Sequence, residues 1–129
     1  MNKKEELLDM LTNLTKDKVI KWTISSGSEL NSIVPNANTI IRAFSTEHFG
    51  SIFFLVEQKL LVYHPDLENY YENVRRDVYV ISKGVLQMVI NQEEISEQIM
   101  ADFCQVIEEK NNNTSIDSLF NIFFSERKE

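Results

Sequence analysis

The sequence contains few of the residues that cross-link a chain or give it unusual backbone conformations. Its 129 residues include three glycines, two prolines and one cysteine. A single cysteine cannot form an intrachain disulfide, and three glycines leave little scope for a glycine-rich loop that cradles phosphate. The patterns G-x-x-x-x-G-K-[ST], G-x-G-x-x-G, G-x-S-x-G and H-E-x-x-H are absent as well. We therefore expect a protein that is not an enzyme and that binds no cofactor and no metal.

Long apolar runs are also missing. No stretch approaches the roughly 18 continuous apolar residues that a membrane-spanning helix needs. The N-terminal sequence MNKKEELLDMLTNL has acids within its apolar pattern, unlike a signal peptide. We expect a cytoplasmic protein that does not enter a membrane, and 129 residues suit one domain with its own core.

Positive charge is scarce in the second half of the chain. Residues 1–65 contain seven basic and seven acidic residues, whereas residues 66–129 contain six and thirteen, so the formal charge of −7 lies in the second half. A nucleic-acid-binding protein needs a basic surface to contact phosphates. The adjacent Arg75 and Arg76 lie between Glu72 and Asp77. We therefore expect no nucleic acid among the partners.

The single cysteine, Cys104, lies in the sequence ADFCQVIEE, which has an apolar helical pattern and no cation beside the thiol. A reactive thiolate needs a cationic neighbourhood and access to solvent. We therefore expect Cys104 to be a buried structural residue.

The first half of the chain has the pattern of a helix followed by strands. Leu7, Leu8, Leu11 and Leu14 follow helical spacing, and KVIKWTI at 18–24 alternates as a strand does. The stretch ELNSIVPNANT fits either a short edge strand or a wide turn. We expect TIIRAFS, SIFFLVE and KLLVYH to be three further strands, the last two joined by a tight connection at Gln58-Lys59. The result is an antiparallel meander of three to five strands.

The two central strands are apolar at every position, over residues 52–56 and 60–63. A strand that is apolar on both sides usually has both faces covered, by helices or by another subunit. We therefore expect the sheet to be a middle layer.

The second half of the chain predicts helices that cover this sheet. From an N-cap at Asp66, a helical stripe of apolar residues continues to Val89 across Gly84. A second helix follows over residues 92–110, with apolar residues inward and carboxylates outward. A third, apolar C-terminal helix is expected over 115–129, where it docks on its own chain or binds a second one.

The stretch EHFGSIFFLVEQKLLVYHPD contains both histidines, each beside a carboxylate, and raises the question of a metal or acid–base site. With a connection at Gln58-Lys59, extended strands separate His48 from His64 by well over roughly 10 Å. Metal ligands must all reach the ion at about 2.0–2.2 Å. We therefore expect His64 and Asp66 to form the corner before a helix, and His48 and Glu47 to belong to a different turn.

Three sets of residues are candidates for binding. The first is an acidic helical face with Glu93, Glu94 and Glu97, where residues 93 and 97 share one side of a helix. The second is the group of C-terminal aromatic anchors, Phe120, Phe123 and Phe124. The third is a small-ligand pocket near His64, Tyr71 and Arg75, with Tyr71 and Arg75 one helical turn apart.

The order of a leading helix, the strand sequence KVIKW, a meander and the sequence YYENVRR resembles that of small uncharacterised bacterial proteins with a helix–meander–helix layout. The resemblance covers about residues 5–80. It implies the same layout for this chain and implies no catalytic residue.

These patterns predict a single α+β domain over residues 1–129, with helix and sheet in 1–65, acidic helices in 66–110 and an apolar C-terminal helix in 115–129. Two or three C-terminal helices would then cover the sheet. The predicted function is a non-catalytic interaction protein of the immunity, antitoxin or regulatory type, whose acidic helical face binds a basic protein. The alternative is a homodimeric structural protein, or one that binds a small ligand.

Overall fold

The computed structural model describes residues 1–25 and 30–111 and has an α+β fold. Its elements, in chain order, are α1 (Lys3–Lys16), β1 (Thr23–Ile24), β2 (Ile40–His48), β3 (Ser51–His64), β4 (Asn69–Ser82), β5 (Val85–Ile90) and a helix over residues 97–111. The strands form one five-stranded sheet in the order β1-β2-β3-β4-β5, and every neighbouring pair is antiparallel. The predicted meander is therefore confirmed.

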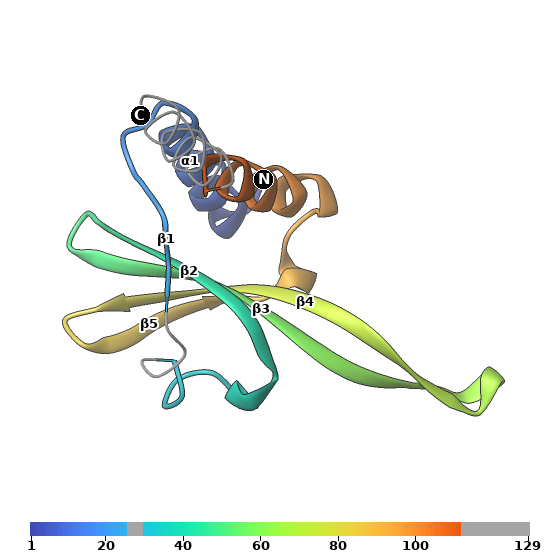
Figure 1. Ribbon diagram of the computed structural model, residues 1–129. Coiled ribbons are helices and arrows are strands. Elements are labelled where there is room, and N and C mark those ends of the chain that lie inside the picture. The colour runs from blue at the N-terminus through green and yellow to red at the C-terminus, as the bar shows by residue number, and fades with distance from the viewer. Residues whose placement is uncertain (26–29, 112–129) are drawn as a thin grey trace, which may run out of the picture.

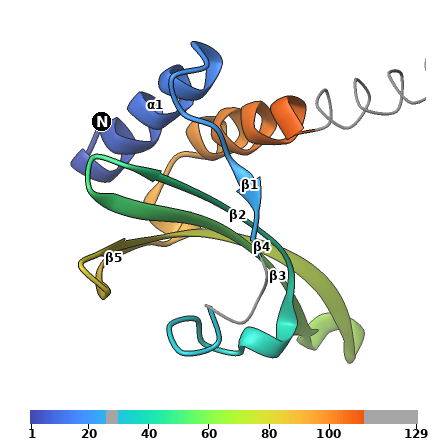
Figure 2. The same ribbon diagram turned by 60° about the vertical axis from the view of Figure 1, so that its left-hand side comes forward.

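The sheet lies between two unequal layers. Figures 1 and 2 show α1 and the 97–111 helix side by side on one face of the sheet, which we call the helix side. The segment 30–39 lies against the opposite face, which we call the loop side. Ile52 to Val56 therefore have neighbours on both faces, as their unbroken apolar pattern predicts.

The larger core lies on the helix side. Leu8 and Leu11 of α1 and Phe103 and Ile107 of the 97–111 helix are all buried against the sheet. Between them, the Trp22 ring meets the Phe103 ring edge-on at 5.5 Å, and its Nε1 donates a hydrogen bond to Thr15 Oγ1 at 3.0 Å. Trp22, which comes just before β1, thus contacts both α1 and the 97–111 helix within this core.

Cys104 belongs to this core, as predicted. The thiol is buried, and burial raises its pKa to about 12. A thiol in this setting stays protonated and unreactive at neutral pH.

The smaller core lies on the loop side, where Leu30 and Val34 pack on Phe54 and Val56 of β3. The segment is also held by hydrogen bonds, because the Gln58 side-chain amide donates to the Pro35 carbonyl at 2.8 Å. The stretch is therefore the wide turn, including a 3-10 helix over Ala37–Thr39, rather than an edge strand.

The helix predicted from Asp66 to Val89 is wrong, because this region forms β4 and β5. Gly84, which the predicted helix crosses, instead belongs to a two-residue hairpin turn: Lys83 and Gly84 have φ of 53° and 74°, and Ser82 pairs with Val85. The apolar spacing fits a helix, but the side chains are mostly β-branched or aromatic, which favours strands.

The connection predicted at Gln58-Lys59 is also wrong. β3 continues through this point, and each of its 14 residues has a partner in β4. His48 pairs with Ser51 across the Phe49-Gly50 turn, whereas His64 pairs with Asn69 at the other end of β3. Thirteen residues of strand hold the histidines roughly 40 Å apart.

The predicted strand over 18–24 is shorter than expected, because only Thr23 and Ile24 pair with β2. The predicted acidic helix after β5 is confirmed over 97–111, with Phe103, Val106 and Ile107 buried. One helix therefore follows the sheet in the described structure, against an expectation of two or three, and the helix predicted over 115–129 lies outside the described residues.

Phe103→Ala should lower the free energy of unfolding by about 3–5 kcal/mol, because it leaves a cavity beside Trp22 in the buried core. The emission of Trp22, the single tryptophan, should shift to longer wavelength as water reaches the ring. Urea titrations that follow this fluorescence measure both effects. The control is Phe49→Ala at a residue that is 62% exposed, which should change stability by less than about 0.5 kcal/mol.

Candidate functional site

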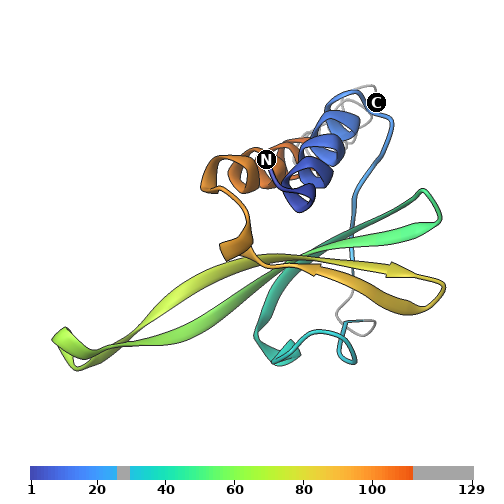
Figure 3. The same ribbon diagram turned by 180° about the vertical axis from the view of Figure 1, so that it is seen from behind.

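Residues 59–74 form a two-stranded arm that projects from the sheet (Figures 1 and 3). The arm exists because the flanking strands are shorter than β3 and β4. β2 begins at Ile40 opposite Gln58, and β5 ends at Ile90 opposite Val78, so beyond these points β3 pairs with β4 alone. The tip is the four-residue turn Pro65–Glu68, with Glu68 at φ 48°.

The helix side of the arm carries uncovered apolar side chains. Leu61 is 69% exposed and Tyr70 is 63% exposed, and Tyr63 and Val74 are exposed beside them. The Tyr63 and Tyr70 rings lie 5.2 Å apart in a cross-strand pair. Neither helix reaches this part of β3 and β4 (Figure 3). The arm therefore presents aromatic and aliphatic side chains to solvent.

The loop side of the arm is more closely packed within the ribbon. Leu60 and Val62 are half-buried, and the His64 and Tyr71 rings meet at 6.1 Å. His64 Nδ1 is buried and has no hydrogen-bond partner within the described residues. Both faces of the arm therefore carry apolar side chains, and more of this apolar surface is exposed on the helix side.

A buried carboxylate anchors the base of the arm on the helix side. Glu57 is 3% exposed and accepts hydrogen bonds from Arg42 on β2 at 2.7 Å and from Arg76 on β4 at 3.3 Å. Arg42 also pairs with Glu108 of the 97–111 helix, and these carboxylates raise the pKa of Arg42. The network joins three strands and a helix at the point where the arm leaves the body.

A second group of ion pairs lies at the base of the arm on its loop side. Arg75 donates to Asp77 Oδ2 at 2.7 Å and to Glu93 Oε2 at 2.7 Å. Its hydrogen bond with Asp77, followed by that with Glu93, raises the pKa of Arg75. The buried Asp77 carboxylate also accepts the Gln92 backbone N–H at 2.9 Å. Both arginines of the pair Arg75–Arg76 are thus used within the chain, where they hold the arm to the sheet.

The predicted ligand residues His64, Tyr71 and Arg75 all lie on the loop side of the arm. His64 contacts Tyr71, but Arg75 is four strand residues farther along and is held by Asp77 and Glu93. The helical spacing on which this group was based is wrong, because the three residues lie on strands. A ligand site there stays a prediction.

The predicted acidic face is divided by the structure. Glu93 and Glu94 lie in a 3-10 turn before the helix, so they do not share a helical face with Glu97. Glu93 pairs with Arg75, and Glu94 pairs with Lys4 at 2.8 Å. Glu97 is exposed at the start of the 97–111 helix. The three aromatic anchors predicted in 115–129 lie outside the described residues.

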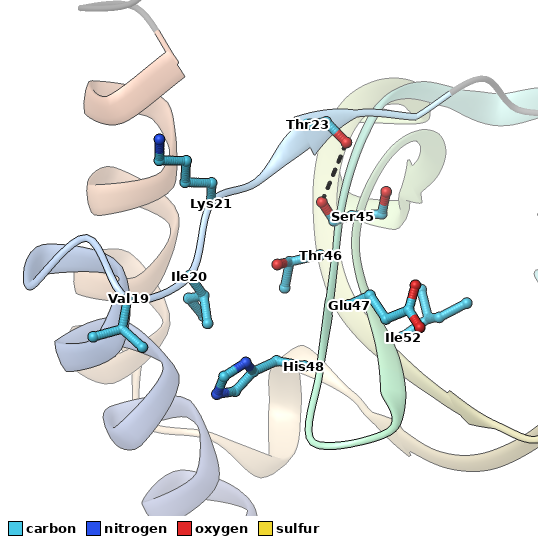
Figure 4. A pocket seen from close by; sticks show the side chains of 9 residues that line it. All are labelled: Val19, Ile20, Lys21, Thr23, Ser45, Thr46, Glu47, His48 and Ile52. Carbon is cyan, nitrogen blue, oxygen red and sulfur yellow. Dashed lines mark hydrogen bonds between the residues drawn. The ribbon is translucent and has the colours of Figure 1, made fainter.

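An open cleft of about 500 Å³ lies between the 19–23 segment and the end of β2 (Figure 4). His48 points toward Val19 and Ile20, whereas Glu47 points the other way, because neighbouring residues of a strand alternate between faces. His48 and Glu47 therefore do not converge on one reacting atom. Across the described parts of the chain, no three histidine, cysteine or acidic side chains gather where they could hold a metal ion.

The sequence reasoning missed the exposed residues of the arm, Leu61, Tyr63, Tyr70 and Val74. A signal for the hairpin was present: two stretches rich in β-branched and aromatic residues flank HPDLEN, which contains the turn formers proline and aspartate. Hydropathy alone does not indicate that the neighbouring strands stop short of this hairpin.

Glu93→Gln should reduce the free energy of unfolding by less than about 1 kcal/mol at neutral pH, because the ion pair with Arg75 is largely exposed. The hydrogen bond from Arg75 lowers the pKa of Glu93 from 4.5 in the folded protein. The ionised Glu93 therefore adds stability at a pH above the pKa that it has in the unfolded chain. This added stability is lost as the pH falls through the lower pKa of Glu93 in the folded protein. Urea unfolding at neutral and strongly acidic pH should show the difference from wild type disappearing in acid.

Glu47→Gln is the control for this measurement, because the exposed Glu47 makes no ion pair in the part of the chain that the structure describes. A stability difference for Glu93→Gln that persists in acid would show that lost packing, rather than lost charge, is responsible.

No helix in residues 1–25 or 30–111 has both the length and the apolar character needed to cross a membrane. No protein-family model matches the chain, and searches of curated proteins and of solved structures gave no match either. The functional assignment therefore depends on the site alone.

Proposed function

We propose that the protein is a non-catalytic protein-interaction protein and that the arm is its binding element. The observation that carries this proposal is the uncovered helix side of the arm, where Leu61, Tyr63, Tyr70 and Val74 face solvent. Lys59 and Glu72 lie on the same face and pair with each other, so the surface combines exposed apolar side chains with one ion pair. Exposed apolar surface bordered by polar residues marks interaction sites in soluble proteins. Tyrosine is also among the residues that contribute most to binding at interfaces.

The construction of the arm supports a binding role. A two-stranded ribbon by itself is at best marginally stable in water, and cover by another element stabilises it. Here the ion-pair groups around Glu57 and Asp77 hold its base, so a partner would meet a pre-formed ribbon. Pre-formed binding surfaces lose less conformational entropy when they bind.

The charge of the arm supports a basic partner. Residues 59–74 contain Asp66, Glu68 and Glu72 but only one lysine, Lys59, which pairs with Glu72 at 2.9 Å. Asp66 and Glu68 at the tip make no ion pair within the described residues. The expected occupant is therefore an apolar protein segment flanked by lysine or arginine. Regulatory, immunity and antitoxin proteins act by binding of this kind, and we propose this class of role.

The proposed binding surface is the arm, whereas the sequence predicted the acidic helical face. Glu93 and Glu94 already have cationic partners in the same chain, so they offer less charge to a second protein than the tip of the arm does. The net charge of −7 then contributes mainly to the rate and specificity of association.

The double variant Leu61→Ser/Tyr70→Ser should abolish capture of a basic partner from a lysate of the source cells. Both residues are exposed, so the variant should keep the unfolding midpoint of the wild type. Capture by immobilised wild type, compared at low and high salt and identified by mass spectrometry, is the measurement. Binding should weaken at high salt, because part of the attraction is between charges.

The matched control is Val85→Ser/Phe49→Ser, which removes two equally exposed apolar side chains from the opposite end of the sheet. It should capture the partner as wild type does. Equal capture by the arm variant would exclude the arm as the binding element, and binding indifferent to salt would exclude a basic partner.

A further inference from the structure

The edge of β3 along the arm has no partner within residues 1–25 and 30–111. β2 begins at Ile40, opposite Gln58, so no strand pairs with residues 59–64 on that edge. Apart from the ladder with β4, no hydrogen bond in the described structure reaches the backbone of residues 60–64. The edge is a regular strand, because the register with β4 shows no bulge from Ser51 to His64.

The outer edge of β5 is protected. In β5, Gln87 forms a bulge opposite the Val80–Ile81 step, and Lys4 Nζ donates to the Val89 carbonyl at 3.1 Å. Bulges and lysines are devices by which proteins prevent edge-to-edge pairing.

The outer edge of β4 along the arm has no partner strand, but two of its N–H groups are bonded to side chains and its sequence includes the charged residues Glu72, Arg75 and Arg76. The Arg76 N–H donates to Gln92 Oε1 at 2.9 Å, and the Tyr70 N–H donates to Asn69 Oδ1 at 2.8 Å. The β3 edge has such residues only at its ends, Lys59 and Pro65, and the sequence LLVYH between them contains no lysine, acid or proline. An apolar, regular and unprotected edge is a template for another strand.

We propose that a second copy of this chain pairs with this edge, strand β3 against strand β3, around a twofold axis at Val62. Leu60 then lies opposite His64 of the second copy, Leu61 opposite Tyr63 of the second copy, and the two Val62 residues oppose each other. The inference rests on the proposed function, because the second copy adds its Leu61 and Tyr63 to the same binding surface. The four strands β4-β3-β3-β4 form one platform.

Geometry selects this register. Directly opposite residues in an antiparallel pair point to the same face, so the twofold axis passes through a residue rather than between two. An axis at Leu61 would place His64 of the second copy beside Gln58, where Ile40 already pairs. An axis at Val62 is the first that avoids Ile40, and it pairs the whole free stretch 60–64 with itself.

Charge complementarity favours a second copy as the occupant. In this register no like charges lie opposite each other. Lys59 of each copy lies beside the turn of the other, which carries Asp66 and Glu68. After pairing, the outermost edges of the platform are the β4 edges, whose charged residues Glu72, Arg75 and Arg76 oppose the addition of further strands. The geometry therefore predicts a dimer rather than an open-ended fibre.

Charge substitutions at the axis test the pairing. Val62→Lys and Val62→Glu each place two like charges opposite one another, so each variant alone should weaken dimerisation by about tenfold or more. A mixture of the two should form heterodimers, because opposite charges then meet. Sedimentation velocity of wild type, each variant and the mixture at tens of micromolar measures this. A monomeric wild type, or a mixture that stays as dissociated as its components, would overturn the proposal.

Cross-linking tests the register independently. Val62→Cys should give a covalent dimer under mild oxidation, because opposed residues lie about 4.5–5.5 Å apart, within disulfide range. Tyr71→Cys is the control: Tyr71 pairs with Val62 inside each arm, so the two copies of residue 71 are three strand spacings, roughly 14 Å, apart. Cys104 is buried and should not interfere. Efficient cross-linking through residue 71, or none through residue 62, would overturn this register.

These outcomes are separable from the proposed function. If the wild type is monomeric and the double variant Leu61→Ser/Tyr70→Ser no longer captures the partner, the proposed function is supported and the dimer is overturned. If the Val62 variants change dimerisation as predicted but the arm captures no basic partner, the dimer is supported and the proposed function is overturned. Species that grow beyond two copies with concentration would contradict the closed assembly.

Discussion

The rest of the structure depends on the uninterrupted pairing of β3 with β4. All 14 residues of β3 have a partner in β4, from Ser51 to His64. One half of this ribbon is covered on the helix side by the two helices and on the loop side by the segment 30–39, which gives the two cores. The other half continues past the ends of β2 and β5. The same hairpin is thus the centre of the body at one end and an exposed binding element at the other.

Much of the architecture can be predicted from apolar periodicity and turn chemistry. The first helix, the meander and the 97–111 helix each have a pattern that only one kind of element fits well. The region 67–89 does not, because Tyr70, Val74, Val78 and Ile81 satisfy helical spacing and also lie on extended strands. Composition is decisive there: β-branched and aromatic side chains with a Lys83-Gly84 turn favour a hairpin. Periodicity over such a stretch cannot distinguish a helix from a pair of strands. Both faces of the ribbon carry apolar residues, so apolar positions also occur at helical spacing.

The site was harder to predict than the fold, for a physical reason. Leu61 and Tyr63 have the same apolar character as Phe53 and Leu55 on the same face of β3, yet the first two are exposed and the second two are buried. What differs is the length of the neighbouring strands and where the helices lie, which are long-range properties of the chain. The ion pairs of Glu93 and Glu94 could not be predicted from local sequence either, because their cationic partners, Arg75 and Lys4, are distant in sequence.

The Glu57 network has a mechanical consequence. From Glu57 to the tip at His64 the arm is a lever of roughly 23 Å. Its fulcrum is tied by Arg42 to Glu108, near the point where the chain continues beyond residue 111. A load applied at the tip therefore acts as a torque on the 97–111 helix. The ion pairs that Arg42 makes with Glu57 and Glu108 therefore oppose bending of the arm relative to that helix.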